Sequence, residues 1–130
     1  MKSDSAIHTL ILLTAAVLLP ACIDYCPEGG IIARPQTFEC GPVAAGDSAH
    51  AVFRVRNASA DTVTLTLMPE CDCTVLDMKR IILAPHERTR VCAAARIERA
   101  GEYVKYIFVQ KENSEFFITL SIHGNAISTE

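Results

Sequence analysis

The sequence predicts an all-β protein: an Ig-like antiparallel β-sandwich of about seven strands that follows an N-terminal signal segment. Three observations predict it. From Ile31 onward apolar and polar residues alternate with a period of two, turn residues interrupt the alternation about every ten positions, and no helical period is sustained in the mature part. The 130 residues, 50% of them hydrophobic, suffice for one domain with a real core.

Residues 1–21 are typical of an export signal. Lys2 lies in a short start, and the apolar run 10–19 has about half of the roughly 20 residues that a membrane-spanning helix needs. The run is therefore a signal core and not a transmembrane anchor. We expect a signal peptide (1–21), a lipidated Cys with a tether (22–30), and the β-sandwich domain (31–127).

The junction Leu19-Pro20-Ala21-Cys22 resembles a bacterial lipobox, in which the thiol of the final Cys is acylated. The resemblance implies that Cys22 anchors the chain to a membrane through lipid. The alternative is an ordinary cleaved signal followed by a structural Cys. Ile23, and not Asp, follows Cys22, so the usual acidic signal for inner-membrane retention is absent at that place. We expect a location in the bacterial cell envelope, periplasm-facing or at the surface, with the outer membrane favoured.

The expected strands are separated by turn residues, among them Gly41-Pro42, Gly46-Asp47 and Ala100-Gly101. Alternation within each strand predicts which face is buried; Val91, Ala93 and Ala95, for example, should point inward. The expected strands are 36–40, 49–56, 62–67, a less regular stretch 75–83, 90–96, 103–110 and 115–123.

The charge pattern and the motifs exclude several functions. The formal charge is -3, and Lys and Arg are dispersed along the sequence, which argues against a nucleic-acid partner. The pairs His86-Glu87 and Asp47 with His50 come without a positioned nucleophile, and there is no Gly-rich phosphate loop. We therefore expect neither an enzyme nor a cofactor.

The cysteines of an exported chain are expected to pair, because the compartment is oxidising. Once Cys22 is lipidated, an odd number remains, so at least one thiol is free or bound to something else. The remaining cysteines, all of them disulfide candidates, are Cys26, Cys40, Cys71, Cys73 and Cys92.

The pair Cys71 and Cys73 allows three interpretations. In an extended chain their Cα atoms would lie roughly 6.6 Å apart, at the upper edge of what a disulfide spans. The favoured interpretation is therefore a structural disulfide from one of them to Cys92 or Cys40. Such a crosslink would stabilise the fold by roughly 3 to 4 kcal/mol.

The second interpretation is a site for a soft metal ion. The thiolates of Cys71 and Cys73 would hold Cu(I) or Zn(II). The third is a redox pair, which Asp72 disfavours because a nearby carboxylate raises a thiol pKa. Further ligands for the metal would come from Cys92, Cys40, His50, His86 or His123.

The order and spacing of several landmarks over residues 35–126 resemble the bacterial domain of unknown function 1573 family. The landmarks are Phe38-Glu39-Cys40-Gly41-Pro42-Val43 with Gly46-Asp47, Asn57, Cys71-Asp72-Cys73-Thr74, Leu83-Ala84-Pro85 and Leu120-Ser121-Ile122-His123-Gly124. The sequence departs from the pattern at Cys40, where the family has a core Phe, and at Asp72 and His86, where it has Gly. The resemblance implies an Ig-like domain of exported proteins and no particular activity.

These observations lead us to expect a non-catalytic, lipid-anchored envelope protein that acts as a binding or structural module. Sandwiches of this type bind through edge strands and end loops, so a protein partner in the envelope is expected. A lipoprotein that binds Cu or Zn through Cys71 and Cys73 is the alternative, and a thiol-redox accessory factor is the third reading. The sequence leaves the oligomeric state open.

Overall fold

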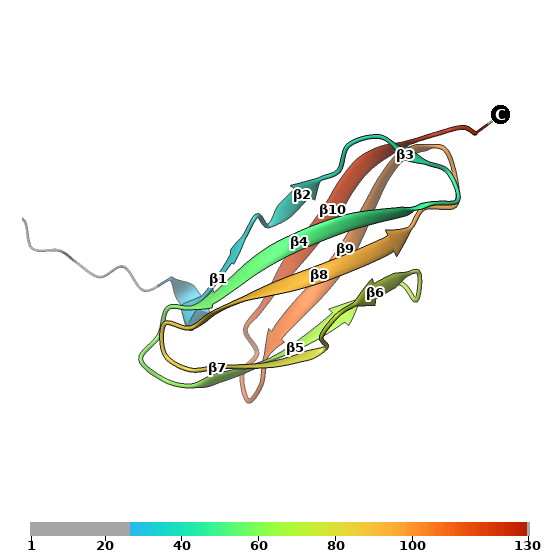
Figure 1. Ribbon diagram of the computed structural model, residues 1–130. Coiled ribbons are helices and arrows are strands. Elements are labelled where there is room, and N and C mark those ends of the chain that lie inside the picture. The colour runs from blue at the N-terminus through green and yellow to red at the C-terminus, as the bar shows by residue number, and fades with distance from the viewer. Residues whose placement is uncertain (1–26, 130) are drawn as a thin grey trace, which may run out of the picture.

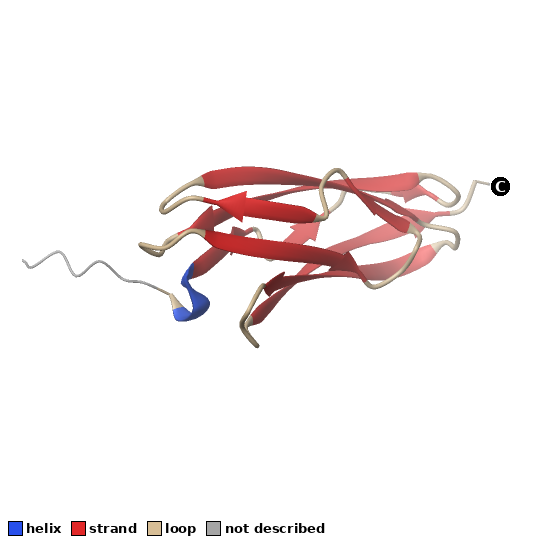
Figure 2. Cartoon of the chain, turned by 90° about the horizontal axis from the view of Figure 1, so that it is seen from below, coloured by secondary structure: helices blue, strands red, loops and turns tan. Residues whose placement is uncertain are grey.

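The computed structural model describes residues 27–129, which form two β-sheets packed face to face (Figures 1 and 2). The four-stranded sheet has the order β1-β4-β8-β6, and the six-stranded sheet has the order β2-β10-β9-β5-β7, with β3 also paired to β10. The elements are the short helix η2 (Glu28–Gly30) and the strands β1 (Ile31–Arg34), β2 (Thr37–Glu39), β3 (Val43–Ala44), β4 (Ser48–Asn57), β5 (Val63–Pro69), β6 (Thr74–Leu76), β7 (Arg80–Leu83), β8 (Arg88–Arg96), β9 (Gly101–Lys111) and β10 (Phe117–Ile127).

The all-β sandwich is confirmed, and the strand count is higher than the predicted seven. The short strands β1 and β3 were not predicted, and the irregular stretch 75–83 is divided between β6 in one sheet and β7 in the other. The sandwich is also not wholly antiparallel, because β2 and β3 pair parallel to β10. The chain passes from one sheet to the other between β1 and β2 without reversing direction (Figure 1).

The core lies between the sheets and follows the period-two alternation. Val91, Ala93 and Ala95 of β8 are buried, as predicted, and so are the alternate residues of β4. Phe53 is fully buried and contacts Phe38 edge to face, with ring centroids 6.2 Å apart. The largest fully buried side chains are Phe53, Leu65, Leu67, Leu83, Ile107, Leu120, Ile122, Val55, Val91, Val109 and Asn57.

Asn57 is the polar member of this set. Its Nδ2 donates to the carbonyl oxygens of Asp61 (2.6 Å), Leu83 (3.1 Å) and Ala84 (3.1 Å), and its Oδ1 accepts from both the backbone N–H and the hydroxyl of Ser59. A buried amide is tolerated only when its donors and acceptors are paired. Asn57 therefore ties the end of β4 to the end of β7 in the opposite sheet.

Gly124 lies opposite Tyr103 in the β9–β10 ladder. A Cβ atom at residue 124 would overlap the phenol ring of Tyr103, so the close approach of this ring requires glycine. Burial and the neighbouring Cys40 thiol raise the pKa of Tyr103 to about 12, so its phenol stays neutral at physiological pH.

We expect Gly124→Ala to lower the free energy of unfolding by about 1–3 kcal/mol, because the added methyl group overpacks the contact with Tyr103. Chemical denaturation measures the change. Gly41→Ala is the matched control: nothing lies within 4 Å of a Cβ built there, so its stability should stay within about 0.5 kcal/mol of the parent. Equal losses of stability in the two variants would show that the contact with Tyr103 does not require glycine at residue 124.

Candidate functional site

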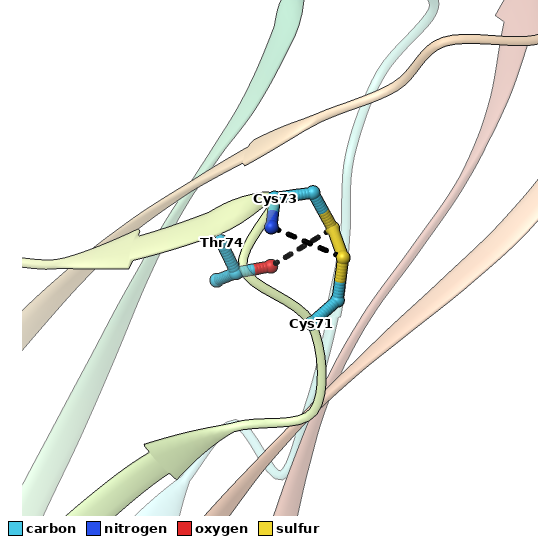
Figure 3. The surroundings of a disulfide bond; sticks show 3 residues. All are labelled: Cys71, Cys73 and Thr74. Atoms are coloured by element: carbon cyan, nitrogen blue, oxygen red, sulfur yellow. Dashed lines mark hydrogen bonds between the residues drawn. A yellow bond between two sulfur atoms is a disulfide. The ribbon is translucent and has the colours of Figure 1, made fainter.

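The structure joins Cys71 to Cys73 by a disulfide (Figure 3). This corrects the expectation that one of them bonds Cys40 or Cys92. Their Cα atoms are 5.1 Å apart, well below the separation in an extended chain, because the chain turns at Asp72. The N–H of Thr74 donates to the carbonyl of Cys71 at 3.1 Å and closes this turn. The sequence argument assumed an extended strand through the pair.

The disulfide lies where the chain crosses from β5 in one sheet to β6 in the other, and hydrogen bonds tie this corner to both sheets. The N–H of Arg96 donates to the carbonyl of Cys73 (2.9 Å), and the N–H of Glu70 donates to the carbonyl of Tyr106 (2.9 Å). Within the pair, the N–H of Cys73 donates to Sγ of Cys71 at 3.0 Å. The disulfide thus closes a tight corner and crosslinks no distant strands.

A hollow of about 510 Å³ adjoins this corner. Both cysteines line it, together with the basic residues Arg96, Arg99 and Lys105 and the acidic residues Glu98 and Glu102. Because the charges are mixed, the hollow has no strong preference for an ion of either sign.

Cys40 and Cys92 are free thiols. Cys40 follows β2, is partly buried against the core, and its Sγ donates to the carbonyl of His50 at 3.5 Å. Burial, with a smaller contribution from the Glu39 carboxylate, raises the pKa of the Cys40 thiol. Cys92 is exposed on the outer face of β8. Cys22 and Cys26 lie outside the described residues.

The residues proposed as metal ligands do not come together. Across residues 27–129 no group of three or more His, Cys, Asp or Glu side chains is arranged to hold a metal ion. The sulfur atoms of Cys71 and Cys73 are bonded to each other and so offer no thiolates. His50 instead lines a hollow of about 240 Å³ beside Cys40, and His123 is held by two carboxylates.

His123 bridges three strands on the outer face of the six-stranded sheet. Its Nε2 lies 2.8 Å from Glu102 of β9, and its Nδ1 lies 2.6 Å from Glu39 of β2. The hydrogen bond to Glu102, followed by that to Glu39, raises the pKa of His123 above 6.5. In its protonated form the imidazole adds charged hydrogen bonds between β10 and its two neighbours, the edge strand β2 and β9.

Sequence reasoning missed a strongly basic surface of the domain, which we call the arginine face. It lies on the outside of the four-stranded sheet and consists of Arg34, Arg54, Arg56, Arg88 and Arg90. Strand register places these residues in two rows: Arg34, Arg54 and Arg90 are neighbours across three strands, and Arg56 lies between Ile32 and Arg88. Five of the twelve Lys and Arg residues of the whole chain are thus neighbours.

No carboxylate neutralises the arginine face from within its own strands. Among the outward positions of β1, β4 and β8, all of which are described, none is Asp or Glu. None of the five arginines takes part in the salt bridges found within residues 27–129. The nearest acidic residues in the sequence lie in connecting segments, as Glu87 does. Nε of Arg56 is buried and has no hydrogen-bond partner.

Two adjoining hollows open on the arginine face. One of about 300 Å³ is lined by Arg34, Arg54, Arg56 and Arg88 with the apolar residue Ile32, and it adjoins Val55, which is itself fully buried. The other, of about 350 Å³, is lined by Arg34, Arg54 and Arg90 with Pro35, Phe38 and Val52. Each combines several guanidinium groups with an apolar lining, an arrangement suited to an anionic group attached to an apolar body.

A signal for the arginine face was present in the sequence. Arg54-Val55-Arg56 and Arg88-Thr89-Arg90 each place two arginines on the same side of a strand. The expectation that basic residues are dispersed holds along the sequence and fails in space, because β4 and β8 pair. The absence of a nucleic-acid partner stays a prediction, supported now only by the net charge of -3.

The fold and this surface define an Ig-like β-sandwich module with an arginine-rich face. The family described as "Protein of unknown function (DUF1573)" matches residues 31–126, and the chain belongs to this family. No curated protein matches the sequence. No helix within the described part of the chain is long and apolar enough to cross a membrane.

Several solved structures share the fold at low sequence identity. The ASH/PapD-like domain of human CEP192 has a TM-score of 0.66 and 11% identity, over 78% of this chain and 87% of that one. A protein of unknown function from Porphyromonas gingivalis W83 has a TM-score of 0.64 and 11% identity, over 78% and 49%. The CsuC-CsuE chaperone-tip adhesion subunit pre-assembly complex of Acinetobacter baumannii has a TM-score of 0.57 and 7% identity, over 74% of this chain and 56% of that one. The chain spans about half of each of the last two.

Of the two free thiols within residues 27–129, alkylation of the folded protein without reductant should label Cys92 before Cys40, because burial raises the pKa of Cys40 and so lowers its thiolate fraction. Cys71 and Cys73 should stay unlabelled. Trypsin cleavage after Arg56 and Lys79 leaves the pair within one peptide, whose mass should be lower by two hydrogen atoms. A peptide crosslinked to Cys40 or Cys92 would contradict this pairing.

The raised pKa of His123 predicts a pH dependence of stability. The folded state favours the protonated imidazole, so its contribution is fully present below pH 6.5, the ordinary pKa, and is lost as the pH rises through the folded-state pKa. NMR titration should find the pKa of His123 above 6.5 and lower in Glu102→Gln. Glu115→Gln, an exposed control in the loop that joins β9 to β10, should leave the pKa of His123 unchanged. If Glu115→Gln also lowers the pKa of His123, the role assigned to Glu102 is wrong.

Proposed function

We propose that the protein is a non-catalytic, lipid-anchored module of the bacterial cell envelope that binds an anionic ligand through the arginine face. The single observation that carries the proposal is the gathering of five arginines on one face of a chain whose net charge is -3, with no salt bridge from any of them to another residue of 27–129. The fold adds support, because chaperone and PapD-like domains with this fold are among its structural neighbours.

Electrostatics favours a binding role for the arginine face over a structural one. Like charges directly opposite each other on neighbouring strands destabilise a sheet, and Arg34, Arg54 and Arg90 are opposite one another. An anion between them would remove this repulsion. Guanidinium groups bind phosphate and carboxylate through paired N–H donors.

The lipobox-like junction supports the anchor, with Cys22 as the acylated residue and the outer membrane favoured. The intact mass of the protein extracted from the membrane fraction should exceed that of the chain from Cys22 to Glu130 by its acyl groups. A mass equal to that of the unmodified chain would exclude the anchor, and it would not bear on anion binding by the arginine face.

The two alternative functions, soft-metal binding and a thiol-redox role, have weaker support than anion binding by the arginine face. Soft-metal binding requires thiolates at Cys71 and Cys73, and these sulfurs are joined. A thiol-redox role is the second candidate because the disulfide lines an open hollow, where a thiol of a partner could reach it. Nothing in the corner, however, matches the concentration of charge at the arginine face.

Inorganic tripolyphosphate is a simple probe of the arginine face. Calorimetric titration at low salt should detect binding that weakens as salt is added, because the contacts are between charges. Arg54→Gln with Arg90→Gln should weaken it at least about tenfold, since a hydrogen bond to a charged group contributes about 1.5–3 kcal/mol.

The matched control is Arg80→Gln with Arg99→Gln, which removes the same charge elsewhere on the domain. It should weaken tripolyphosphate binding by less than about threefold, the effect of long-range charge alone. Equal losses in the two double variants, or no binding by the parent protein, would refute an anion site on the arginine face.

A further inference from the structure

We infer that the arginine face binds the phosphate headgroups of anionic phospholipids in the membrane that carries the chain's own anchor. The inference rests on the proposed function and names its ligand. It is carried by the position of the arginine face at the end of the sandwich where the domain begins, by the length of the tether, and by the apolar linings of the two hollows.

The arginine face lies where the described chain starts. β1 begins at Ile31, and its residues Ile32 and Arg34 pair with Arg56 and Arg54 of β4, near the end of that strand. Arg88 and Arg90 are at the beginning of β8. In Figure 1 the start of β1, the end of β4 and the start of β8 lie together at one end of the sandwich, and β3 and the C-terminus lie at the other.

The tether is too short to let this end move far from a membrane. Five residues of chain lead from Cys22 to Pro27, which span at most about 18 Å when fully extended. An anchor at Cys22 therefore keeps the arginines within a few Debye lengths of the headgroups, since one Debye length is about 8 Å at physiological salt. Such tethering turns weak contacts into an effectively intramolecular equilibrium.

The chemistry of the two hollows fits phospholipids better than an acidic protein surface. A phospholipid layer presents many identical phosphates, each on an apolar body, to a broad face that spans three strands. The hollows place guanidinium groups beside Ile32, and beside Pro35, Phe38 and Val52. An acidic polypeptide could pair with the arginines. Nothing in the position of the arginine face near the anchor, however, would favour a polypeptide over the membrane.

Docking in this way orients the whole domain. The outer face of the six-stranded sheet, on the opposite side of the sandwich, then points away from the membrane. That face carries Met68, Val104, Tyr106 and Phe117, all exposed apolar or aromatic side chains. The corner at Cys71 and Cys73, far from the anchored end, also stays open to the aqueous phase.

Vesicle sedimentation tests the inference. The probe is the mature chain from Cys22 to Glu130 prepared without acyl groups, so that lipid insertion does not mask the contribution of the arginines. We expect binding to vesicles of phosphatidylcholine and phosphatidylglycerol (about 7:3) at low salt and none to pure phosphatidylcholine. Arg54→Gln with Arg90→Gln should weaken binding at least about tenfold, since each basic residue near an anionic surface contributes about fivefold.

The outcomes separate this inference from the proposed function. Arg80→Gln with Arg99→Gln should lower vesicle affinity by less than about threefold, and an equal loss would show that only net charge matters, which overturns the inference. If the chain binds tripolyphosphate but not anionic vesicles, the proposed function stands and the membrane ligand is refuted in favour of a soluble or protein anion. If it binds neither, both fail.

Discussion

The buried amide of Asn57 holds together the end of the sandwich on which the arginine face is built. Its hydrogen bonds reach the turn after β4 and the carbonyls of Leu83 and Ala84, and its own N–H donates to the carbonyl of Glu87 at 2.9 Å. The end of β4 is thereby fixed against the segment that leads into β8. Arg56 and Arg88, the immediate neighbours of these two positions, are brought side by side.

This constraint explains how a mildly acidic chain presents a strongly basic face. The strand alternation directs apolar side chains into the core and sends the arginines of β1, β4 and β8 outward. Cross-strand register then places guanidinium groups opposite one another at an electrostatic cost. Without a ligand, the packing of the core and the hydrogen bonds of Asn57 offset this repulsion between arginines. A bound anion would remove the repulsion.

How far the sequence alone predicts this structure depends on the physical origin of each feature. The buried faces of β4 and β8 follow from a period of two. The burial of Phe53 or Val91 can therefore be predicted without knowing which strand lies next to it. Two landmarks of the family have local causes in the structure: Asn57 satisfies carbonyls at a sheet crossing, and Gly124 makes room for Tyr103. The parallel pairing of β2 depends on the path of the chain between sheets, which alternation does not encode.

The candidate sites were harder to predict for the same reason. An extended backbone argued against a bond between Cys71 and Cys73, and the turn at Asp72 removes that premise. The arginine face was missed because charge was judged by runs along the sequence. Arg54 and Arg90 lie far apart in the chain and become neighbours only when the register of β4 and β8 is known.

The most direct measurement follows the arginine side chains themselves. In NMR spectra of the Nε–Hε groups, titration with bicelles that contain phosphatidylglycerol should shift the resonances of Arg54, Arg56, Arg88 and Arg90, and leave those of Arg80 and Arg99 in place. Shifts confined to Arg96 and Arg99 beside the Cys71–Cys73 corner, with the arginine face unchanged, would contradict the account.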